Sequence, residues 1–401
     1  MNALNTSTFM GTARYRLGIV TTHPIQYHSP FFRALASAQD VALQVFYSYH
    51  PTAQQQADAG FGVRFDWDVP LLEGYSYTFL SKELTIRDVI TKNRFDAVMV
   101  NGWSYAEAIQ TILRCWATRT PVMIRSDSHL HTPRNPIKSV IKYLPYRAFI
   151  TKVDACLAVG RWSRDYYAHY GAEPERVFEV PHVIDLDRFD SEIKRFIPER
   201  KALRTYWELA DDAVVFLFAG KFIDKKRPAD FVRAISQAAS RDPRIQALMV
   251  GDGALREKCE ALAQSLRAPV KFAGFLNQSE ITKAYTAADA MVLPSDGGET
   301  WGMVVNEAMF SGLPCLVSDK VGCGPDLIRH DTGAVFRLGD DKQLAALLCS
   351  FAQDPQRLRL MGQSARHLIE ERYSPHKAVH LLLEAVSAVA RPTPRLGEYA
   401  H

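Results

Sequence analysis

Runs of Val, Ile, Leu and Phe alternate with longer stretches of helical periodicity along the first half of the chain. Each run is short and continuously apolar, which is typical of a parallel strand that is buried on both faces. Five such runs lie at residues 16–21, 43–47, 97–100, 122–124 and 155–159. Strands that alternate with helices in this way predict a doubly wound α/β sheet.

The same rhythm restarts after about residue 190, with runs at 214–218, 246–250, 270–272, 290–293 and 314–317. Residues 184–200 are charged, carry Pro198 and show no clear strand, so we place the linker there. The pattern predicts two Rossmann-like, doubly wound parallel-sheet domains, at residues 1–190 and 191–374. Because ligands of such sheets bind beyond the carboxyl ends of the strands, the expected site is a cleft that both domains face.

Length and composition support two globular domains. The chain has 401 residues, of which 47% are hydrophobic and 23% charged, and this length exceeds what one compact core organises. No run of about 18 apolar residues could span a bilayer, and residues 1–16 lack the apolar centre of a signal peptide. A cytoplasmic location is therefore expected. A net charge of +4 is too small to indicate nucleic-acid binding.

A glycine-rich turn joins the predicted strand at 290–293 to a predicted helix at 303–310. Backbone N–H groups and the positive end of a helix dipole make such a place suitable for a phosphate. Glu299 lies in the turn and Glu307 lies eight positions later, inside the helix. Because carboxylates repel phosphate, sugar hydroxyls are their better partners, and a diphosphate between two polyols fits the arrangement. The alternative is that Glu299 only caps the helix and Glu307 is solvated.

A basic loop follows the first strand of the second half. Gly220 lets the chain turn where the sheet ends, and four basic residues crowd positions 221–227. Lys221 and Lys226 are candidates to neutralise the charge that a diphosphate gains as it leaves. The alternative is a solvated loop whose lysines contact nothing, which is the commoner outcome for a basic run.

Two polar segments follow strands of the first half. Residues 125–131 include Asp127 and His129, and a carboxylate or histidine there could orient or polarise a reacting hydroxyl. Residues 21–30 could line the opposing wall of the cleft, with three candidate acceptor-side residues, His23, Gln26 and Tyr27. The alternative for such histidines is an ordinary hydrogen-bonded loop.

Residues 134–152 hold five basic residues and no acidic one. Four aliphatic residues recur there at helical spacing, while Lys138 and Lys142 lie on another face; the four are Ile137, Val140, Ile141 and Leu144. Such a segment could rest on the inner, anionic face of a membrane. We favour a core-facing helix with solvated lysines, and Pro145 is expected to interrupt any long interfacial helix.

With these motifs the second half resembles the retaining, GT-B-fold glycosyltransferases of family four, the group-1 glycosyl transferases. The family's motifs occur in order: the entry to the linker at 180–189, the phosphate loop with Gly220, Lys221 and Lys226, the loops at 250–255, 272–276 and 287–295, and two glutamates with seven residues between them. Lys221 stands where the family usually has an arginine. A lysine there still binds phosphate, without the bidentate geometry.

The resemblance implies a division of roles in the donor site. Glu299 would bind hydroxyls of the donor sugar, and Glu307 would bind the ribose. The backbone after Glu299 would hold the diphosphate, and two apolar residues would lie by the base. These are Trp301, Gly302, Met303 and Val304 for the phosphates, and Phe275 and Leu276 for the base.

The resemblance also implies the reaction. A hexosyl group would move from a nucleotide-diphosphate sugar to an acceptor hydroxyl with retention of configuration, and no metal or other cofactor would take part. The two Asp-X-Asp triplets, at 66–68 and 185–187, lie outside the donor loops, and we interpret neither as a metal site. The expected acceptor is a saccharide or a lipid-linked one, in polysaccharide or glycolipid biosynthesis.

The first half resembles the family more loosely. Simple spacing puts Asp127 where the family often has a histidine, and His129 follows two residues later. We choose His129 as the acceptor-side catalytic residue, beside Glu299 on the donor side, and keep Asp127 as the alternative. Residues 23–29 replace the family's glycine-rich N-terminal loop. Residues 375–390 resemble the helix that crosses back to the first domain in this fold, so residues 375–401 form a third segment.

Two other functions stay open, because a fold does not fix a reaction. A nucleotide-sugar epimerase of the same fold would change its substrate without an acceptor. A non-catalytic subunit would bind nucleotide sugar without turnover. The nucleotide base, the sugar and the acceptor are likewise open at this stage.

Overall fold

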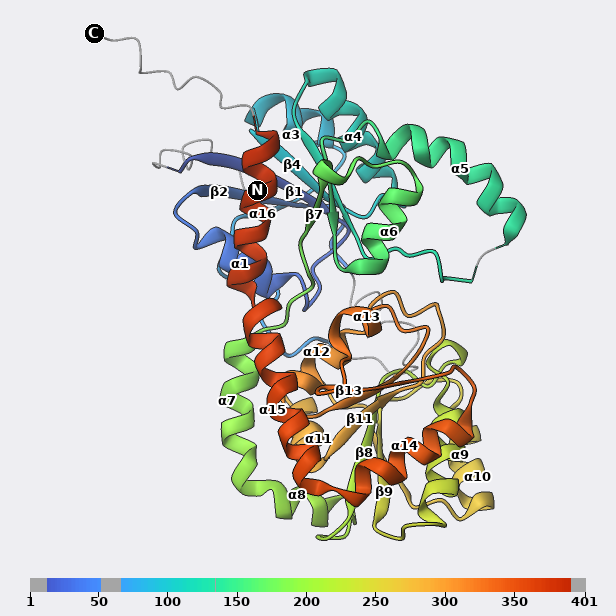
Figure 1. Cartoon of the computed structure of the whole chain (residues 1–401). Coiled ribbons are helices and arrows are strands. Elements are labelled where there is room, and N and C mark those ends of the chain that lie inside the picture. Colours follow the sequence, from blue (N-terminus) through green and yellow to red (C-terminus); the bar gives the residue numbers. More distant parts are fainter. Residues whose placement is uncertain (1–12, 52–65, 134, 391–401) are drawn as a thin grey trace.

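The computed structural model describes residues 13–51, 66–133 and 135–390. Their strands form two sheets, one in each half of the chain, and the two domains lie one above the other (Figure 1). The first sheet has seven strands in the order β3-β2-β1-β4-β5-β6-β7, and the second has six in the order β10-β9-β8-β11-β12-β13. Every strand pair is parallel. The predicted fold of two doubly wound parallel-sheet domains is confirmed.

The first sheet is buried on both faces, because alternate side chains of each strand point to opposite sides. In β1, Leu17 and Ile19 pack toward α1 and the C-terminal helix α16, while Val20 packs toward α3 and α4. The strands are β1 (Tyr15–Thr21), β2 (Val41–Tyr47), β3 (Tyr77–Phe79), β4 (Ala97–Asn101), β5 (Val122–Ser126), β6 (Ala155–Ala158) and β7 (Val177–Glu179). The helices are α1 (Ser29–Ala36), α3 (Ile86–Asn93), α4 (Ala106–Thr118), α5 (Pro136–Ile150) and α6 (Arg161–His169), with a 3-10 turn at Pro174–Arg176.

The second sheet is built in the same way. In β8, Leu217 packs toward α7, α11 and α12, while Phe216 and Phe218 pack toward α9, α10 and α14. The strands are β8 (Val214–Ala219), β9 (Ile245–Val250), β10 (Val270–Gly274), β11 (Ala290–Leu293), β12 (Cys315–Ser318) and β13 (Gly333–Phe336). The helices are α7 (Leu186–Phe196), α8 (Arg200–Tyr206), α9 (Pro228–Ala239), α10 (Arg256–Leu266), α11 (Ile281–Ala287), α12 (Met303–Phe310), α13 (Gly324–Leu327), α14 (Asp341–Gln353) and α15 (Pro355–Arg372), with 3-10 turns at Ile197–Glu199 and Asp224–Lys226.

The segment expected to be a linker is largely helical. Helix α7 (Leu186–Phe196) begins where Asp185 accepts a hydrogen bond from the backbone N–H of Arg188. Its buried residues Phe189 and Ile193 belong to the core of the second domain. The predicted boundary after residue 190 therefore falls inside a helix. An amphipathic helix rich in charged residues was mistaken for a linker, because only every third or fourth side chain is apolar.

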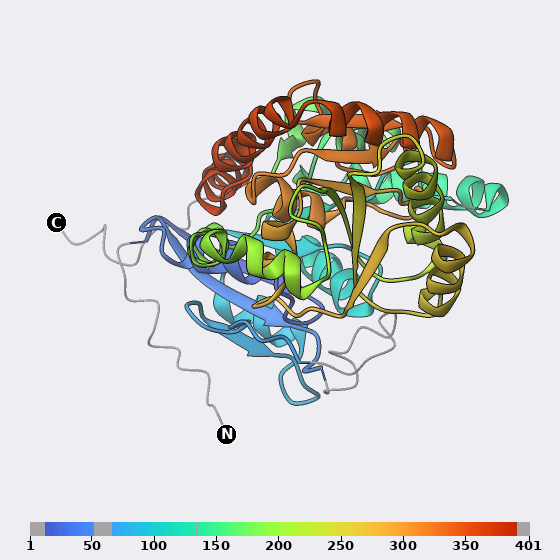
Figure 2. The same cartoon turned by 90° about the horizontal axis from the view of Figure 1, so that it is seen from below.

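Helix α16 (Pro375–Val389) returns to the first domain. Its buried residues, among them Val379 and Leu382, join the core around α1 and β1. Figure 2 shows the red C-terminal helices along one side of the molecule. The rest of the predicted third segment, residues 391–401, and most of the N-terminal segment examined for a signal peptide lie outside the described residues. In the described part of the chain, no helix combines the length and apolar character needed to cross a bilayer.

Helix α5 (Pro136–Ile150) corrects two expectations. It continues through Pro145, because Asn135 caps its start and Phe149 and Ile150 pack into the core at its end, which offsets the lost backbone hydrogen bond. Its aliphatic face does not point to the core. Figure 1 shows the helix extending away from the body of the domain beside α6. The four aliphatic side chains, which we call the outer face of α5, are Ile137, Val140, Ile141 and Leu144, with exposed fractions of 69%, 76%, 67% and 72%.

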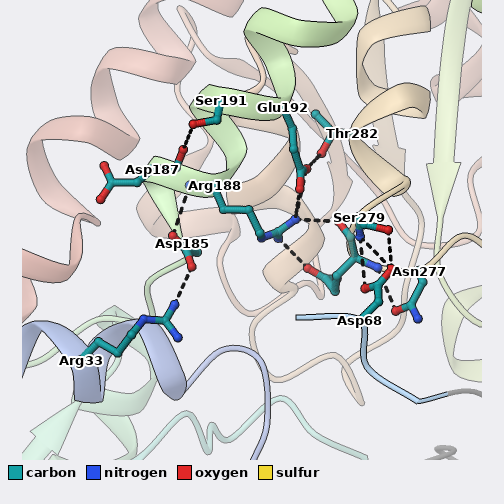
Figure 3. A network of polar contacts seen from close by, with 11 residues as sticks. Arg33, Asp68, Asp185, Asp187, Arg188, Ser191, Glu192, Asn277, Ser279 and Thr282 are labelled. Atoms are coloured by element: carbon teal, nitrogen blue, oxygen red, sulfur yellow. Dashed lines mark hydrogen bonds and ion pairs between the residues drawn. The ribbon is translucent and has the colours of Figure 1, made fainter. Parts of the chain in front are cut away.

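Polar contacts join the two domains beside α7 (Figure 3). Arg33 of α1 donates to the Asp185 carboxylate at 2.5 Å, and Asp185 also caps α7. Within the second domain, Arg188 of α7 donates to the side-chain and backbone oxygens of Gln278 at 2.7 and 2.6 Å, beside the loop residues that meet the first domain. The Arg33–Asp185 pair is thus a charge-assisted contact between the two domains.

Both Asp-X-Asp triplets contribute to this contact between domains. The Asp68 carboxylate accepts from the backbone N–H of Ser279 at 3.2 Å, and the backbone oxygen of Asp66 accepts from Asn277 at 2.7 Å. Asp185 of the other triplet is occupied by Arg33. One carboxylate of each triplet, Asp68 and Asp185, therefore has a structural partner in this arrangement. Metal-independent donor binding stays a prediction.

Candidate active site

A cavity of about 420 Å³ lies between the two domains. The first domain contributes the segments that follow β1, β4 and β5, and β1 and β4 are the neighbours at which the strand order of this sheet reverses. Such a switch point is where doubly wound sheets bind ligands. The second domain contributes Lys226 and residues 299–304. The cavity thus lies where the sequence predicted a cleft.

The glycine-rich turn between β11 and α12, residues 294–302, has the geometry expected for an anion site. We call it the donor turn. Gly302 precedes the first residue of α12 with φ +103°, a conformation that favours glycine, and a Cβ atom there would lie 2.9 Å from Leu293. Met303 and Val304, the first residues of α12, line the cavity. The start of the helix therefore faces the space between the domains, where its N–H groups and dipole favour a phosphate.

Glu299 and Lys226 form an ion pair inside the cavity. Their side chains are only 11% and 12% exposed, and Ser295 donates a hydrogen bond to the same carboxylate oxygen of Glu299. Burial acts to raise the pKa of Glu299, but Lys226 and Lys225 outweigh it, so the net pKa is lowered and the carboxylate is ionised. Glu299 does not cap α12, and Lys226 is not a solvated loop lysine. Both simpler alternatives are excluded for these residues.

Glu307 lies deeper, beside a smaller pocket that Gln26 and Tyr27 also line. Glu307 is 2% exposed, which excludes the alternative that its side chain is solvated. The Tyr285 hydroxyl donates a hydrogen bond to its Oε2 at 2.7 Å. Burial raises the pKa of Glu307, although Tyr285 acts in the opposite direction. Gln278 also lowers this pKa, but Oε1 has no hydrogen bond of normal geometry within the described residues. A buried acceptor of this kind suits a hydroxyl-bearing ligand.

Of the remaining donor-side candidates, Trp301 lines the cavity, whereas Gly220, Lys221, Phe275 and Leu276 do not. Gly220 packs so closely under the next loop that a Cβ atom on Gly251 would meet its carbonyl oxygen at 2.0 Å. Lys221 is half-buried, and burial together with Lys225 and Lys226 lowers its pKa to about 8. Phe275 and Leu276 are half-buried directly after β10. Trp301 lines the cavity, with its ring nitrogen donating to Asn306 at 2.8 Å.

Asp127 reaches the cavity from the end of β5. Its carboxylate accepts a hydrogen bond from the Thr300 hydroxyl of the donor turn at 2.7 Å, and His182 Nε2 lies 3.7 Å from the same oxygen. Arg125 donates to His182 Nδ1 at 3.3 Å, so the proton of a neutral His182 is on Nε2, toward Asp127. Burial acts to raise the pKa of Asp127, but His182 and Thr300 reverse this and hold it well below its usual range. Asp127 is therefore a fixed negative charge opposite the donor turn.

His129, our first choice for the acceptor side, does not line the cavity. It is fully buried, and its ring packs against Trp162 with the centroids 5.1 Å apart. The cause is local, because the backbone N–H of Ser128 bonds to the Ser126 hydroxyl at 3.0 Å and turns the chain away from the cleft. The structure therefore favours Asp127, the alternative, for the acceptor-side position.

The three acceptor-side candidates separate in the structure. Tyr27 lines the cavity, while Gln26 lines only the smaller pocket beside Glu307. His23 stacks on Tyr49 at 5.2 Å, away from the cavity. Only Tyr27 is placed as the sequence interpretation required.

Comparison with known families identifies the two domains. Residues 31–188 match the family model for glycosyltransferase family 4, and residues 199–368 match the model for glycosyl transferases group 1. The chain carries two glycosyltransferase domains. The cavity described above lies where these glycosyltransferase domains meet, and the predicted family resemblance is confirmed at the level of the domains.

Two relatives of these glycosyltransferase domains have names that describe the glycosylation of a lipid or of a small molecule. The GDP-mannose-dependent monoacylated alpha-(1-6)-phosphatidylinositol monomannoside mannosyltransferase of Corynebacterium glutamicum is 27% identical over 236 residues, which are 56% of this chain and 59% of the relative. The D-inositol 3-phosphate glycosyltransferase of Streptomyces bingchenggensis is 30% identical over 240 residues, 57% of this chain and 51% of the relative. The matched region thus spans little more than half the length of either relative.

A solved structure shares the arrangement of the two glycosyltransferase domains. The Anabaena protein HepE, in complex with UDP and glucose, superposes with a TM-score of 0.69 over 93% of this chain and 100% of the Anabaena chain. The sequence identity is 15%. This similarity establishes the GT-B fold.

Sequence reasoning did not single out several residues of the cleft between the glycosyltransferase domains, although His28 lies in the segment 21–30 that was expected to line it. His28 and Asn101 line the cavity, and His28 Nδ1 and both amide atoms of Asn101 are buried without a hydrogen-bond partner within the described residues. His182 and Thr300 were missed as partners of Asp127. Asn101 directly follows the predicted strand at 97–100, so the rule that ligands bind at strand ends contained a signal for it.

Proposed function

We propose that the chain transfers a sugar from a nucleotide-diphosphate sugar to the hydroxyl of an acceptor. The observation that carries this proposal is the shared cavity, in which Lys226, Glu299 and the start of α12 face Asp127 and Asn101 of the other domain. One wall offers partners for a diphosphate and a sugar, and the other offers polar groups for a second molecule. Group transfer requires two such sites within reach of each other.

The donor roles follow from charge and hydrogen bonding. Lys226 and the helix start at Gly302 would hold the diphosphate and stabilise its charge on departure. Glu299 would accept hydroxyls of the donor sugar, and Glu307 would accept the ribose. Transfer with retention of configuration and without a bound metal is part of the proposal.

Asp127 would act as a charge rather than as a general base. A general base works best when its pKa lies near the working pH, and the contacts with His182 and Thr300 keep the pKa of Asp127 well below its usual range. Its ionised carboxylate can orient the acceptor hydroxyl and stabilise positive charge on the donor sugar in the transition state.

The acceptor would be a saccharide or a lipid-linked saccharide on the cytoplasmic side, in polysaccharide or glycolipid biosynthesis. The names of the relatives support this class, because the Corynebacterium enzyme acts on a mannosylated phosphatidylinositol and the Streptomyces enzyme on an inositol phosphate. The UDP and glucose in HepE support a nucleotide-sugar donor.

The direct test is a thermal-shift screen with UDP-, GDP- and ADP-sugars. A donor at 100 times its dissociation constant is expected to stabilise the protein by about 2.7 kcal/mol. Stabilisation by none of them would contradict the proposal. Conversion of the bound nucleotide sugar without an acceptor would identify an epimerase, and binding without turnover over an acceptor panel would identify a non-catalytic subunit.

Peripheral contact with an anionic membrane is a further part of this proposal, and it rests on α5. The outer face of α5 exposes four large aliphatic side chains next to each other, and a patch of this kind marks an interaction surface. Lys138, Lys142 and Arg147 lie on the same helix, and residues 134–152 contain no acid. An apolar face flanked by unopposed positive charge suits the surface of a bilayer that contains anionic lipids.

We expect the protein to cosediment with vesicles of phosphatidylglycerol and phosphatidylcholine, and only weakly with phosphatidylcholine alone. Lys138→Ala with Lys142→Ala removes two charges worth about 1 kcal/mol each at such a surface, so partitioning should fall roughly 30-fold. Ile141→Ser should lower it about tenfold or more. Leu113→Ala is the matched control, because Leu113 is 55% exposed on α4 of the same domain. Equal binding to neutral vesicles, or a loss in the control, would contradict the contact.

A further inference from the structure

A second cavity, of about 410 Å³, adjoins the cleft in the first domain. The two cavities share three lining residues, Gly102, Ser126 and Asp127. The far side of the second cavity is formed by α5, through Lys138 and Lys142 among others. A molecule in it would therefore extend from α5 to the carboxylate that faces the donor turn. We call this space the α5 cavity.

The lining of the α5 cavity is typical of a saccharide site. Hydroxyl groups come from four serines, which can donate and accept hydrogen bonds with sugar hydroxyls; these are Ser104, Ser126, Ser128 and Ser139. Trp103 and Tyr146 supply aromatic surface, with their ring centroids 6.3 Å apart and nearly perpendicular. Aromatic rings beside a few polar groups are common in small-molecule pockets, and they can pack on the C–H face of a sugar ring.

The charge of the α5 cavity indicates an anionic ligand. Lys138 and Lys142 are one helical turn apart and therefore lie on the same face of α5. Within the described residues, neither ammonium group is paired with a carboxylate, and no acid occurs in residues 134–152. The one carboxylate that lines the cavity, Asp127, already contacts Thr300 and His182. Two lysines without an acidic partner suit a phosphate group.

The placement of α5 leaves the charge of these lysines accessible to a ligand. In a helix that covers a core, the aliphatic face points inward and the lysines point to solvent. In α5 the residues that line the cavity are Lys138, Ser139, Lys142 and Tyr146, while the outer face carries the aliphatic side chains. Both lysines are exposed beside the cavity, so a phosphate there can reach their ammonium groups, while Tyr143, Tyr146 and Phe149 pack the helix onto the core.

We propose that the α5 cavity binds a phosphate-bearing saccharide as the acceptor, with the phosphate at Lys138 and Lys142 and a sugar hydroxyl at Asp127. This inference rests on the proposed function, because it names the acceptor of the same cleft. The phosphate-bearing saccharide is either a free sugar phosphate or the head group of a lipid. Both present the same chemistry to the cavity.

The first arm of the test measures binding in solution. With UDP at saturation, glucose 1-phosphate is titrated against intrinsic tryptophan fluorescence or by calorimetry, and glucose serves as the uncharged comparison. We expect glucose 1-phosphate to bind at least tenfold more tightly than glucose. Lys138→Ala and Lys142→Ala should each weaken its binding by roughly tenfold. Lys152→Ala is the matched control, because it lies in the same basic stretch but does not line the cavity.

A second variant separates the cavity from the charge of α5. Ser104 is exposed and lines the cavity opposite the helix. Ser104→Trp should fill the space and abolish binding of glucose 1-phosphate while UDP binding and thermal stability stay unchanged. Persistent binding in this variant would overturn the assignment of the ligand to the α5 cavity.

The second arm tests the lipid source. Vesicles of phosphatidylcholine are doped with either phosphatidylinositol or phosphatidylglycerol at equal surface charge. Tighter binding to phosphatidylinositol, removed by Ser104→Trp, indicates a lipid head group, and a positive first arm alone indicates a free sugar phosphate. The proposal is overturned if neither arm shows a preference that depends on the lysines and the cavity. Failure to bind UDP or any nucleotide sugar would instead contradict the proposed function.

Discussion

Replacing Lys226 by alanine is expected to lower kcat/KM for sugar transfer by about 10²- to 10³-fold, the usual effect of removing one group that stabilises transition-state charge. Lys226 lines the second-domain side of the cavity, where it is the ion-pair partner of Glu299. Its loss removes positive charge where the diphosphate would depart and changes the electrostatics of the sugar-binding carboxylate. Glu299→Gln should reduce transfer to a similar degree.

Because Lys226 and Glu299 form an ion pair, replacing only one of them should also lower the stability of the protein. Lys226→Ala leaves an unpaired carboxylate that is 11% exposed, and we expect a loss of roughly 2–3 kcal/mol, below the value for an enclosed pair because solvent enters the cleft. The double variant Lys226→Met with Glu299→Gln should regain this stability without regaining turnover. Lys201→Ala is the control, since that side chain is 81% exposed and pairs with Asp211. Near wild-type release of nucleotide diphosphate by Lys226→Ala would contradict the donor site.

The central strands could be predicted because burial on both faces leaves continuous apolar runs. The ten predicted runs overlap β1, β2, β4, β5, β6 and β8 to β12. The missed strands β3, β7 and β13 are short and lie at sheet edges, where exposed or half-buried positions break the apolar run. Such a short edge strand forms only by pairing with a neighbouring strand that is distant in the sequence, so its own residues carry little signal.

The orientation of α5 shows a limit of periodicity. The spacing of Ile137, Ile141 and Leu144 correctly indicated that one face of the helix is aliphatic. It did not indicate whether that face is turned inward, because burial depends on what the rest of the chain places beside the helix. Here the inner side is occupied by the α5 cavity and by Tyr143 and Tyr146.

The donor site was easier to predict than the acceptor site for a similar reason. Glu299 and the start of α12 lie in one continuous segment, so their proximity follows from the local chain. Asp127 and Thr300 are 173 positions apart and meet only when the two domains face each other. Sequence spacing left His129 and Asp127 as alternatives, and the turn at Ser126 and Ser128 places Asp127 rather than His129 at the cavity.

The roles of Asp127 and His129 can be distinguished by measuring the activity and the stability of each variant. Asp127→Asn keeps the size of the side chain and its contact with Thr300 but removes the charge, and we expect kcat to fall by about 10²-fold or more while the melting temperature changes little. His129→Leu should instead lower the stability and leave kcat almost unchanged. It alters a fully buried ring packed against Trp162, so it should cost roughly 1–3 kcal/mol of stability and leave kcat of the folded enzyme within about threefold.

The pH dependence gives a second criterion for Asp127. Its pKa is lowered in the folded protein, so the carboxylate stays ionised as pH falls and contributes stability that is lost only when pH falls through the folded pKa. The kcat profile should therefore show no acid limb from Asp127 above about pH 5, because the usual aspartate pKa is already near 4. Asp127→Asn should lower this profile uniformly without changing its shape. If His129→Leu abolished turnover and Asp127→Asn did not, the acceptor-side position would belong to His129, and the inward turn of residues 126–129 would have to open when substrate binds.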